Sequence, residues 1–243
     1  MTLRARIQTA VSLVYPARCV NCGALVDSDF GLCGNCWRET EFISGLVCDC
    51  CGVPVPGEDD GQVVQCDACI QRPQDWDHGR AALVYSGQGR RIVLALKHGD
   101  RTDLARPASG WLARASAPFL KDDPLIVPVP LHWSRLLRRR YNQSALLAQA
   151  LAARTGCQCC PDALARTLAT PMLEGRSREE RSGLLSDAIR PHPRMMDRLE
   201  GRSVLLVDDV MTSGATLSAS ARACFAAGAV AVSVVVLARV TGA

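Results

Sequence analysis

Residues 203–217 read SVLLVDDVMTSGATL, and this stretch decides the fold. Its aliphatic run, Val204–Val207, predicts a strand of a parallel sheet that is buried on both faces. Beyond a short polar loop, apolar residues recur from Leu217 at three- and four-residue spacing, which predicts a helix that Gly228 is placed to end. A second aliphatic run, 230–238, follows at once. The stretch therefore predicts a βαβ unit in an α/β protein.

The loop between this strand and helix has the composition of a phosphate site. In a βαβ unit it lies at the carboxyl edge of the sheet, where backbone N–H groups and the helix dipole favour an anion. Gly214 allows a close backbone approach, and Thr212, Ser213 and Thr216 add hydroxyl donors. Neither GxxxxGK[ST] nor GxGxxG is present, so these two nucleotide-binding loops are excluded.

Two adjacent carboxylates, Asp208 and Asp209, follow the aliphatic run. Ionised carboxylates only accept hydrogen bonds, so they suit the hydroxyls of a sugar whose phosphate lies in the loop. They would equally hold Mg²⁺ through its water shell. The alternative is a plain buried strand that ends in a solvated turn with two chance acids, and the order of aliphatics, acids and loop argues against it.

These residues resemble the 5-phosphoribosyl-1-pyrophosphate (PRPP) motif of type I phosphoribosyltransferases. The resemblance implies a parallel sheet flanked by helices, with Asp208 and Asp209 on the ribose hydroxyls and Mg²⁺ accompanying PRPP. It also implies that a six-residue segment wraps the 5′-phosphate: Met211, Thr212, Ser213, Gly214, Ala215 and Thr216.

The chain has 13 cysteines, and nine of them lie between positions 19 and 69. Four Cys-x-x-Cys pairs in this segment predict two structural zinc ions, each bound by four thiolates; one ion, or an iron–sulfur or redox use, is the alternative. The eight predicted ligands are Cys19, Cys22, Cys33, Cys36, Cys48, Cys51, Cys66 and Cys69.

The partition of these ligands between the two ions has two solutions. Pairing sequence neighbours places residues 19–36 on one ion and residues 48–69 on the other, as in two tandem ribbons, while an interleaved arrangement stays open. Cys50 is the odd thiol. It would replace Cys48 or Cys51 as a ligand only by distorting the knuckle, the tight turn that a Cys-x-x-Cys pair forms around the metal. Closed sites of four thiolates leave no open position for chemistry, so we expect both metals to be structural.

Composition places the chain among globular proteins. It has 243 residues, 48% of them hydrophobic, and a mean hydropathy of +0.07. The net charge of +4 is too small by itself to indicate nucleic-acid binding. The N-terminus has no apolar core of signal-peptide length, and no segment is long and apolar enough to span a bilayer. With cysteines spaced as metal ligands, this predicts a reducing, cytoplasmic location.

We expect two domains, a helix plus double zinc ribbon at 1–75 and a phosphoribosyltransferase-like domain at 76–243. The helix is a short amphipathic one near the N-terminus, with Ile7, Val11 and Val14 on one side. Trp76, in the polar stretch at the boundary, is a candidate to pack between the modules.

The second domain carries a basic segment after another aliphatic strand, 125–130. A strand at 80–86, a helix at 89–97 and a helix at 144–154 are also predicted. The basic side chains would meet an anion, either the pyrophosphate of PRPP or a nucleic-acid backbone, with a solvated face as the alternative. They are Lys97, Arg135, Arg138, Arg139 and Arg140.

The order of all these motifs narrows the resemblance to the ComF family of bacterial late-competence proteins. The carrying segments are the four cysteine pairs, LKHGD, IVPVPLHWSRLLRRRYNQ and VLLVDDVMTSGATL. The resemblance implies a role in natural transformation, handling incoming single-stranded DNA in the cytoplasm beside the DNA-uptake machinery. Two departures stand out: Arg140-Tyr141 lacks the family's glycine, and Leu173 and Leu184 replace polar residues of an accessory loop.

Two other functions remain open: an active phosphoribosyltransferase with an unknown acceptor, and a regulator that senses PRPP or a nucleotide. A glutamine amidotransferase is not expected, because the chain begins Met1-Thr2-Leu3 and so offers no N-terminal cysteine nucleophile. The sequence identifies no acceptor pocket and no catalytic residue.

Overall fold

The stretch 203–217 lies at the centre of the fold. In the computed structural model, which describes residues 16–27, 31–167 and 188–241, it forms strand β5 (Ser203–Met211) and the start of helix α10 (Ala215–Ala226). Strand β6 (Ala231–Arg239) follows and pairs in parallel with β5, so the βαβ prediction is confirmed. Strand β5 is longer than expected, because pairing with β6 continues through the two aspartates to Met211.

Within the described residues, the main sheet has the strand order β1-β6-β5-β2, and every neighbouring pair is parallel. Strand β1 spans His78–Val84 and β2 spans Leu125–Pro128. The predicted strand at 125–130 ends early, since proline lacks the N–H that a ladder needs. Because all four strands run the same way, their carboxyl ends share one edge, where the loop after β5 meets the segment after β2.

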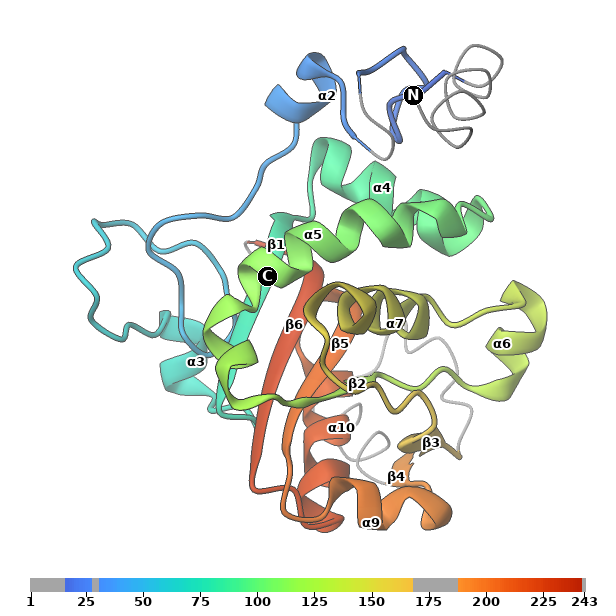
Figure 1. The fold of residues 1–243 in the computed structure, drawn as a ribbon. Helices are drawn as coiled ribbons and strands as arrows, with labels where there is room; N and C mark the ends of the chain where they lie inside the picture. Colours follow the sequence, from blue (N-terminus) through green and yellow to red (C-terminus); the bar gives the residue numbers. More distant parts are fainter. Residues whose placement is uncertain (1–15, 28–30, 168–187, 242–243) are drawn as a thin grey trace, which may run out of the picture.

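Helices cover both faces of the sheet (Figure 1). One face carries α4 (Gly87–His98), α5 (Ala105–Ala115) and α7 (Gln143–Thr155). The other carries α10, α9 (Met196–Leu199) and an antiparallel pair that the sequence did not reveal, β3 (Leu164–Arg166) with β4 (Ile189–Pro191). Short 3-10 turns lie at Thr102–Leu104, Ala117–Asp122 and Pro193–Met195.

The basic segment after β2 forms a helix of its own, α6 (Trp133–Arg139), which was not among the predicted elements. His132 caps it, accepting a hydrogen bond from the Ser134 N–H, so the helix begins at Trp133, shortly after Pro130. Helix α7 begins at the Asn142 cap and ends at Gly156 in the left-handed region, close to the prediction.

The cysteine-rich segment contains two short helices, α2 (Gly34–Arg38) and α3 (Asp67–Gln71). The part with α2, which we call the first ribbon, packs toward α4 and α5; the part with α3, the second ribbon, lies beside β1 (Figure 1). None of the described helices has the length and apolar character needed to cross a membrane. The predicted N-terminal helix, and the loop positions Leu173 and Leu184, lie outside the described residues.

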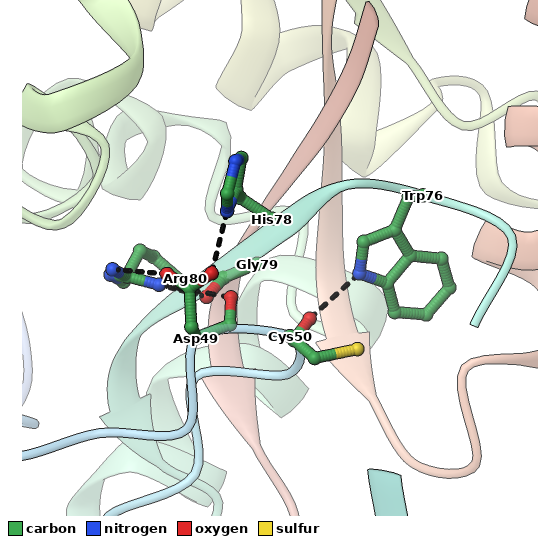
Figure 2. A network of polar contacts seen from close by, with 6 residues as sticks. All are labelled: Asp49, Cys50, Trp76, His78, Gly79 and Arg80. Atoms are coloured by element: carbon green, nitrogen blue, oxygen red, sulfur yellow. Dashed lines mark hydrogen bonds and ion pairs between the residues drawn. The ribbon is translucent and has the colours of Figure 1, made fainter. Parts of the chain in front are cut away.

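The second ribbon is joined to the start of β1 by a polar network (Figure 2). The Gly79 N–H donates to the Asp49 carbonyl at 2.8 Å, and the Asp49 carboxylate contacts His78 at 2.6 Å and Arg80 at 2.8 Å. Burial raises the pKa of Asp49, but hydrogen bonds from His78 and Arg80 outweigh burial and lower it. The ribbon is thereby fixed to the edge strand of the sheet.

Candidate functional site

The loop after β5 encloses a small cavity at the carboxyl edge of the sheet. The cavity has a volume of about 130 Å³ and is lined by Asp208 and by residues 210–217. Gly214 is the N-cap of α10 and has φ +79°, a left-handed conformation that glycine adopts without strain. The first turn of a 12-residue helix opens on this cavity, so its free N–H groups and dipole favour an anion there.

Asp208 is held by two donors at the cavity wall. The Ser144 hydroxyl and the Asp209 N–H donate to its Oδ1, at 2.7 and 2.8 Å. Burial, followed by the charge of Asp209, raises the pKa of Asp208 to about 7, against the opposing effects of Ser144 and Lys97. Asp208 therefore changes its protonation state near neutral pH.

Asp209 is only 7% exposed and forms an ion pair with Lys97, whose Nζ lies 3.1 Å from Oδ1. Lys97 stands in the last turn of α4, next to His98, and so reaches the site from a different element. The structure thus brings Lys97 beside the two adjacent carboxylates, but its ammonium group is paired there with Asp209. A polyphosphate would have to share this lysine with Asp209.

Helix α6 projects from the same edge, and none of its seven residues, all described, is buried. Arg135 and Arg138 are exposed, while Arg139 is partly buried. Burial lowers the pKa of Arg139, and the charge of Asp209 opposes this effect, which places Arg139 within electrostatic reach of the site. Arg140 ends the helix in the left-handed region, at φ +66°.

The apolar side chains of α6 are exposed as well. Trp133 is 64% and Leu137 is 73% exposed. An aromatic ring and arginines on one projecting helix form a surface that suits stacked bases and their phosphates.

Three further side chains surround the site, and none of them was predicted from the sequence. Ser144 holds Asp208, as described above. Arg239, at the end of β6, donates to the carbonyl oxygens of Met211 and Thr212 at 3.2 and 2.8 Å, and so supports the start of the loop. Arg166 lies on β3; burial and then the charge of Arg135 lower its pKa, while Asp208 raises it. Arg166 lies on a three-residue strand that leaves no periodic signal.

The eight predicted ligand cysteines form two groups of four. In each group the sulfur atoms all lie within 4.8 Å of one another, and the groups follow the pairing of sequence neighbours rather than the interleaved one. The Sγ atoms of Cys22 and Cys33 lie 3.7 Å apart, and those of Cys51 and Cys66 lie 3.8 Å apart. Two thiolates bound to tetrahedral zinc at ~2.3 Å are separated by about 3.8 Å, so both tetrads fit zinc.

Within each tetrad the thiols differ in the direction of their pKa shifts. Burial raises the pKa of Cys36, and the neighbouring Cys48 thiol raises that of Cys51, whereas one thiol of each tetrad has a lowered pKa. Burial raises the pKa of Cys19, but N–H groups of Cys22 and other knuckle residues lower it to about 6. A hydrogen bond from Cys51 is the main cause that lowers the pKa of Cys48 to about 4. In the first ribbon Asn21 donates to Cys36 Sγ at 3.3 Å, an outer contact of the kind that orients ligands.

The remaining thiols stand outside both tetrads. Cys50 is buried beside the second tetrad, and burial is the main cause that raises its pKa. Cys160 and Cys224 are buried, and Cys157 and Cys159 are partly buried, as expected of small core residues.

A larger cavity, of about 580 Å³, lies at the opposite edge of the sheet, where the strands begin. Its lining includes the carboxylates of Asp49, Asp77 and Asp122, with Arg80 and His78 engaged by Asp49. Three acids do not favour a polyanion. The smaller cavity at the carboxyl edge is therefore the better candidate for a phosphate.

Comparisons with known proteins match both parts of the chain. Residues 10–70 match the double zinc ribbon domain, and residues 142–242 match the phosphoribosyl transferase domain. The chain is 32% identical over 234 residues to DNA utilization protein YhgH of Escherichia coli strain K12, covering 93% of this chain and 99% of that protein. It is 28% identical over 207 residues to Competence protein F of Haemophilus influenzae, covering 83% and 87% of the two chains.

A third relative is Competence protein ComFC of Bacillus subtilis, 26% identical over 207 residues, which cover 82% of this chain and 79% of that protein. Among solved structures, adenine phosphoribosyltransferase from Thermoanaerobacter pseudethanolicus aligns with a TM-score of 0.39 at 19% identity, covering 62% of this chain and 73% of that one.

Proposed function

Because the chain belongs to the ComF family, we propose that it binds PRPP at the loop after β5 and acts in natural transformation, on incoming single-stranded DNA. The observation that carries the proposal is the 130 Å³ cavity at the N-terminus of α10. Asp208 lines this cavity, and Asp209 is the next residue in the sequence. The relatives' names, DNA utilization protein and competence protein, support the DNA role.

In this proposal the loop residues Met211, Thr212, Ser213, Gly214, Ala215 and Thr216 hold the 5′-phosphate. The carboxylates of Asp208 and Asp209 accept hydrogen bonds from the ribose hydroxyls, and they also suit the water shell of Mg²⁺. The cation, when bound, neutralises pyrophosphate charge. Arg139, near Asp209, is the arginine best placed to meet the pyrophosphate, and Arg135 and Arg138 face solvent, where a DNA backbone is accessible.

The two zinc ribbons have a structural role, with four thiolates for each Zn²⁺. We place the boundary between the ribbons, 1–75, and the phosphoribosyltransferase-like domain, 76–243, at the segment that leads into β1. A reducing cytoplasm fits the thirteen cysteines, all of which are free. The DNA-uptake machinery is the partner that such a role requires.

Calorimetric titration of PRPP and Mg²⁺ into the zinc-loaded protein tests the ligand assignment. Replacing both acids, Asp208→Asn with Asp209→Asn, should weaken binding by roughly a hundredfold, since two charge-assisted sets of hydrogen bonds are lost. Asp122→Asn, at the opposite edge of the sheet, is the matched control and should bind as the wild type does. Unchanged binding by the double variant would refute the site.

Two other functions share this site and differ in outcome. A phosphoribosyltransferase would release pyrophosphate when PRPP and Mg²⁺ are mixed with a nucleobase or ammonia, because the described residues supply the donor half of such a site. A PRPP-sensing regulator would bind without release and change its affinity for DNA. Pyrophosphate release with each acceptor, measured beside DNA affinity with and without PRPP, separates the three.

A further inference from the structure

A buried tryptophan joins the second ribbon to the loop after β5. We call this loop, residues 211–216, the phosphate loop. Trp76 precedes β1 and is only 5% exposed. Its indole Nε1 donates a 2.7 Å hydrogen bond to the carbonyl oxygen of Cys50, which lies between the ligand cysteines Cys48 and Cys51 (Figure 2). The indole is therefore held by the backbone of a metal knuckle.

The far end of the same indole lies against Gly214. A Cβ added to Gly214 would be 2.7 Å from Cη2 of Trp76, closer than real side chains approach, and 3.0 Å from Oε1 of Gln74. Gly214 also has a left-handed backbone, so any other residue would be strained there. Position 214 thus requires glycine for two reasons, and one of them is contact with the tryptophan.

Arg239 supports the same loop from the end of β6. Its Nη1 donates to the carbonyl oxygens of Met211 and Thr212, where the loop begins. The loop is therefore held from the sheet by Arg239, and it lies against the indole of Trp76 at Gly214.

The segment around Trp76 is itself fixed to the βαβ unit. Asp75 forms an ion pair with Arg222 of α10, and the Asp77 carboxylate accepts a hydrogen bond from the Val232 N–H of β6 at 2.8 Å. Trp76 stands between these two anchors. The chain on both sides of Trp76 is therefore fixed to the βαβ unit, and the indole keeps its place between the ribbon and the loop.

We propose that Trp76 is a positioning residue through which the second zinc ribbon sets the conformation of the phosphate loop. The inference rests on the proposed function only for the identity of the ligand, PRPP; the link between ribbon and loop is independent of it. If Trp76 were merely a core residue, its loss would loosen the whole sheet evenly.

Hydrogen exchange of the ligand-free, zinc-loaded chain distinguishes these cases. In Trp76→Phe, which keeps an aromatic ring but loses the bond to Cys50, the amides of residues 212–218 should exchange about fivefold faster, the effect of one buried hydrogen bond. The amides of β5 before Asp208 should keep their wild-type rates, and metal analysis should still find two zinc ions per chain.

Trp37→Phe is the matched control, because Trp37 packs against Phe42 in the first ribbon, with ring centroids 4.4 Å apart and the rings tilted by 34°. It should leave loop exchange unchanged. Wild-type loop exchange in Trp76→Phe would overturn the proposal, and so would even acceleration across β5 and the loop. Failure of the wild type to bind PRPP would refute the proposed function instead, and the exchange result would stand apart from it.

Discussion

Asp208 carries a carboxyl group whose environment favours the neutral form. In the unfolded chain its pKa is near the ordinary value, whereas burial and the charge of Asp209 raise it to about 7 in the folded protein. Between these two values the folded state binds more protons than the unfolded state. The ligand-free protein therefore loses stability as the pH rises through 7, and a cation or hydroxyl groups at the site would relieve this cost.

This reasoning gives a pH prediction for stability. From pH 6 to pH 8 the free energy of unfolding should fall by about 1 kcal/mol through Asp208 alone. Asp208→Asn should lack this component, so the difference in unfolding free energy between variant and wild type should grow with pH. Urea unfolding at pH 6, 7 and 8 measures it, and zinc thiolates contribute equally to both proteins. A difference that does not change with pH would mean that Asp208 does not titrate between pH 6 and pH 8 in the folded protein.

Gly79 shows how closely the second ribbon is packed on β1. A Cβ at Gly79 would overlap the carbonyl oxygen of Cys50, so neither backbone can move without disturbing the other. Gly79→Ala should destabilise the protein by at least ~2 kcal/mol, as overpacked positions do. Gly110 in α5 is the control: a Cβ there meets only Arg154 at 3.6 Å, and alanine should be neutral or stabilising. Thermal unfolding of both variants, with zinc analysis, checks this.

At the scale of elements, the sequence predicted those helices and strands whose buried residues form a recognisable apolar pattern. Strand β5 and helix α7 were predicted because continuous aliphatics and a capped helix are local signals. The pair β3 and β4 was missed, since three-residue strands carry no period, and Arg166 was missed with it. Helix α6 was not predicted, because none of its residues is buried and an exposed helix has no apolar face to give a helical pattern.

The residues of the site divide in the same way, into those that a local pattern predicted and those that other elements contribute. The loop and Asp208 were predicted from adjacent residues, whereas Ser144 and Arg239 reach the site from α7 and β6. Such contacts depend on the order of strands in the sheet, which no local pattern encodes. The pairing of Lys97 with Asp209 was missed for the same reason.

Helix α6 is the element on which DNA binding can be tested. If Arg135 and Arg138 contact phosphates, Arg135→Gln with Arg138→Gln should weaken binding of a labelled single-stranded oligonucleotide. The slope of log affinity against log salt should become less negative by about 1.4, two contacts at ~0.7 each. Fluorescence anisotropy between 50 and 200 mM salt measures this, roughly the range over which such binding changes most.

A matched control exists on α4, where Arg90 and Arg91 are also exposed. The variant Arg90→Gln with Arg91→Gln has the same net charge as the α6 variant. It should keep the wild-type salt slope if contact is local to α6. Equal changes in the two variants would indicate that the net positive charge of the protein, rather than this helix, attracts the oligonucleotide.

At the scale of the whole molecule, the two ribbons belong to different cores. Side chains of the second tetrad pack in the same cluster as α10, whereas Val20 of the first ribbon packs with α4, α5 and α7. The first ribbon is also tied to α4 by hydrogen bonds, from Asn21 to Gln88 at 2.6 Å and from Gln88 to Glu39 at 2.5 Å. The ribbons thus brace opposite faces of one sheet, and they should differ in their effect on the phosphate loop.

Removing the zinc ions one at a time tests this difference. Cys66→Ser should lose the second ion and Cys22→Ser the first, each leaving one zinc per chain, because each tetrad needs all four thiolates. Since Trp76 is hydrogen-bonded to the second ribbon and lies against Gly214 of the loop, Cys66→Ser should speed loop exchange and weaken PRPP binding by at least about tenfold. Cys22→Ser should alter exchange mainly in α4 and spare the loop. If both variants loosened the loop equally, the ribbons would act as one body and the separate bracing argued from the two cores would be wrong.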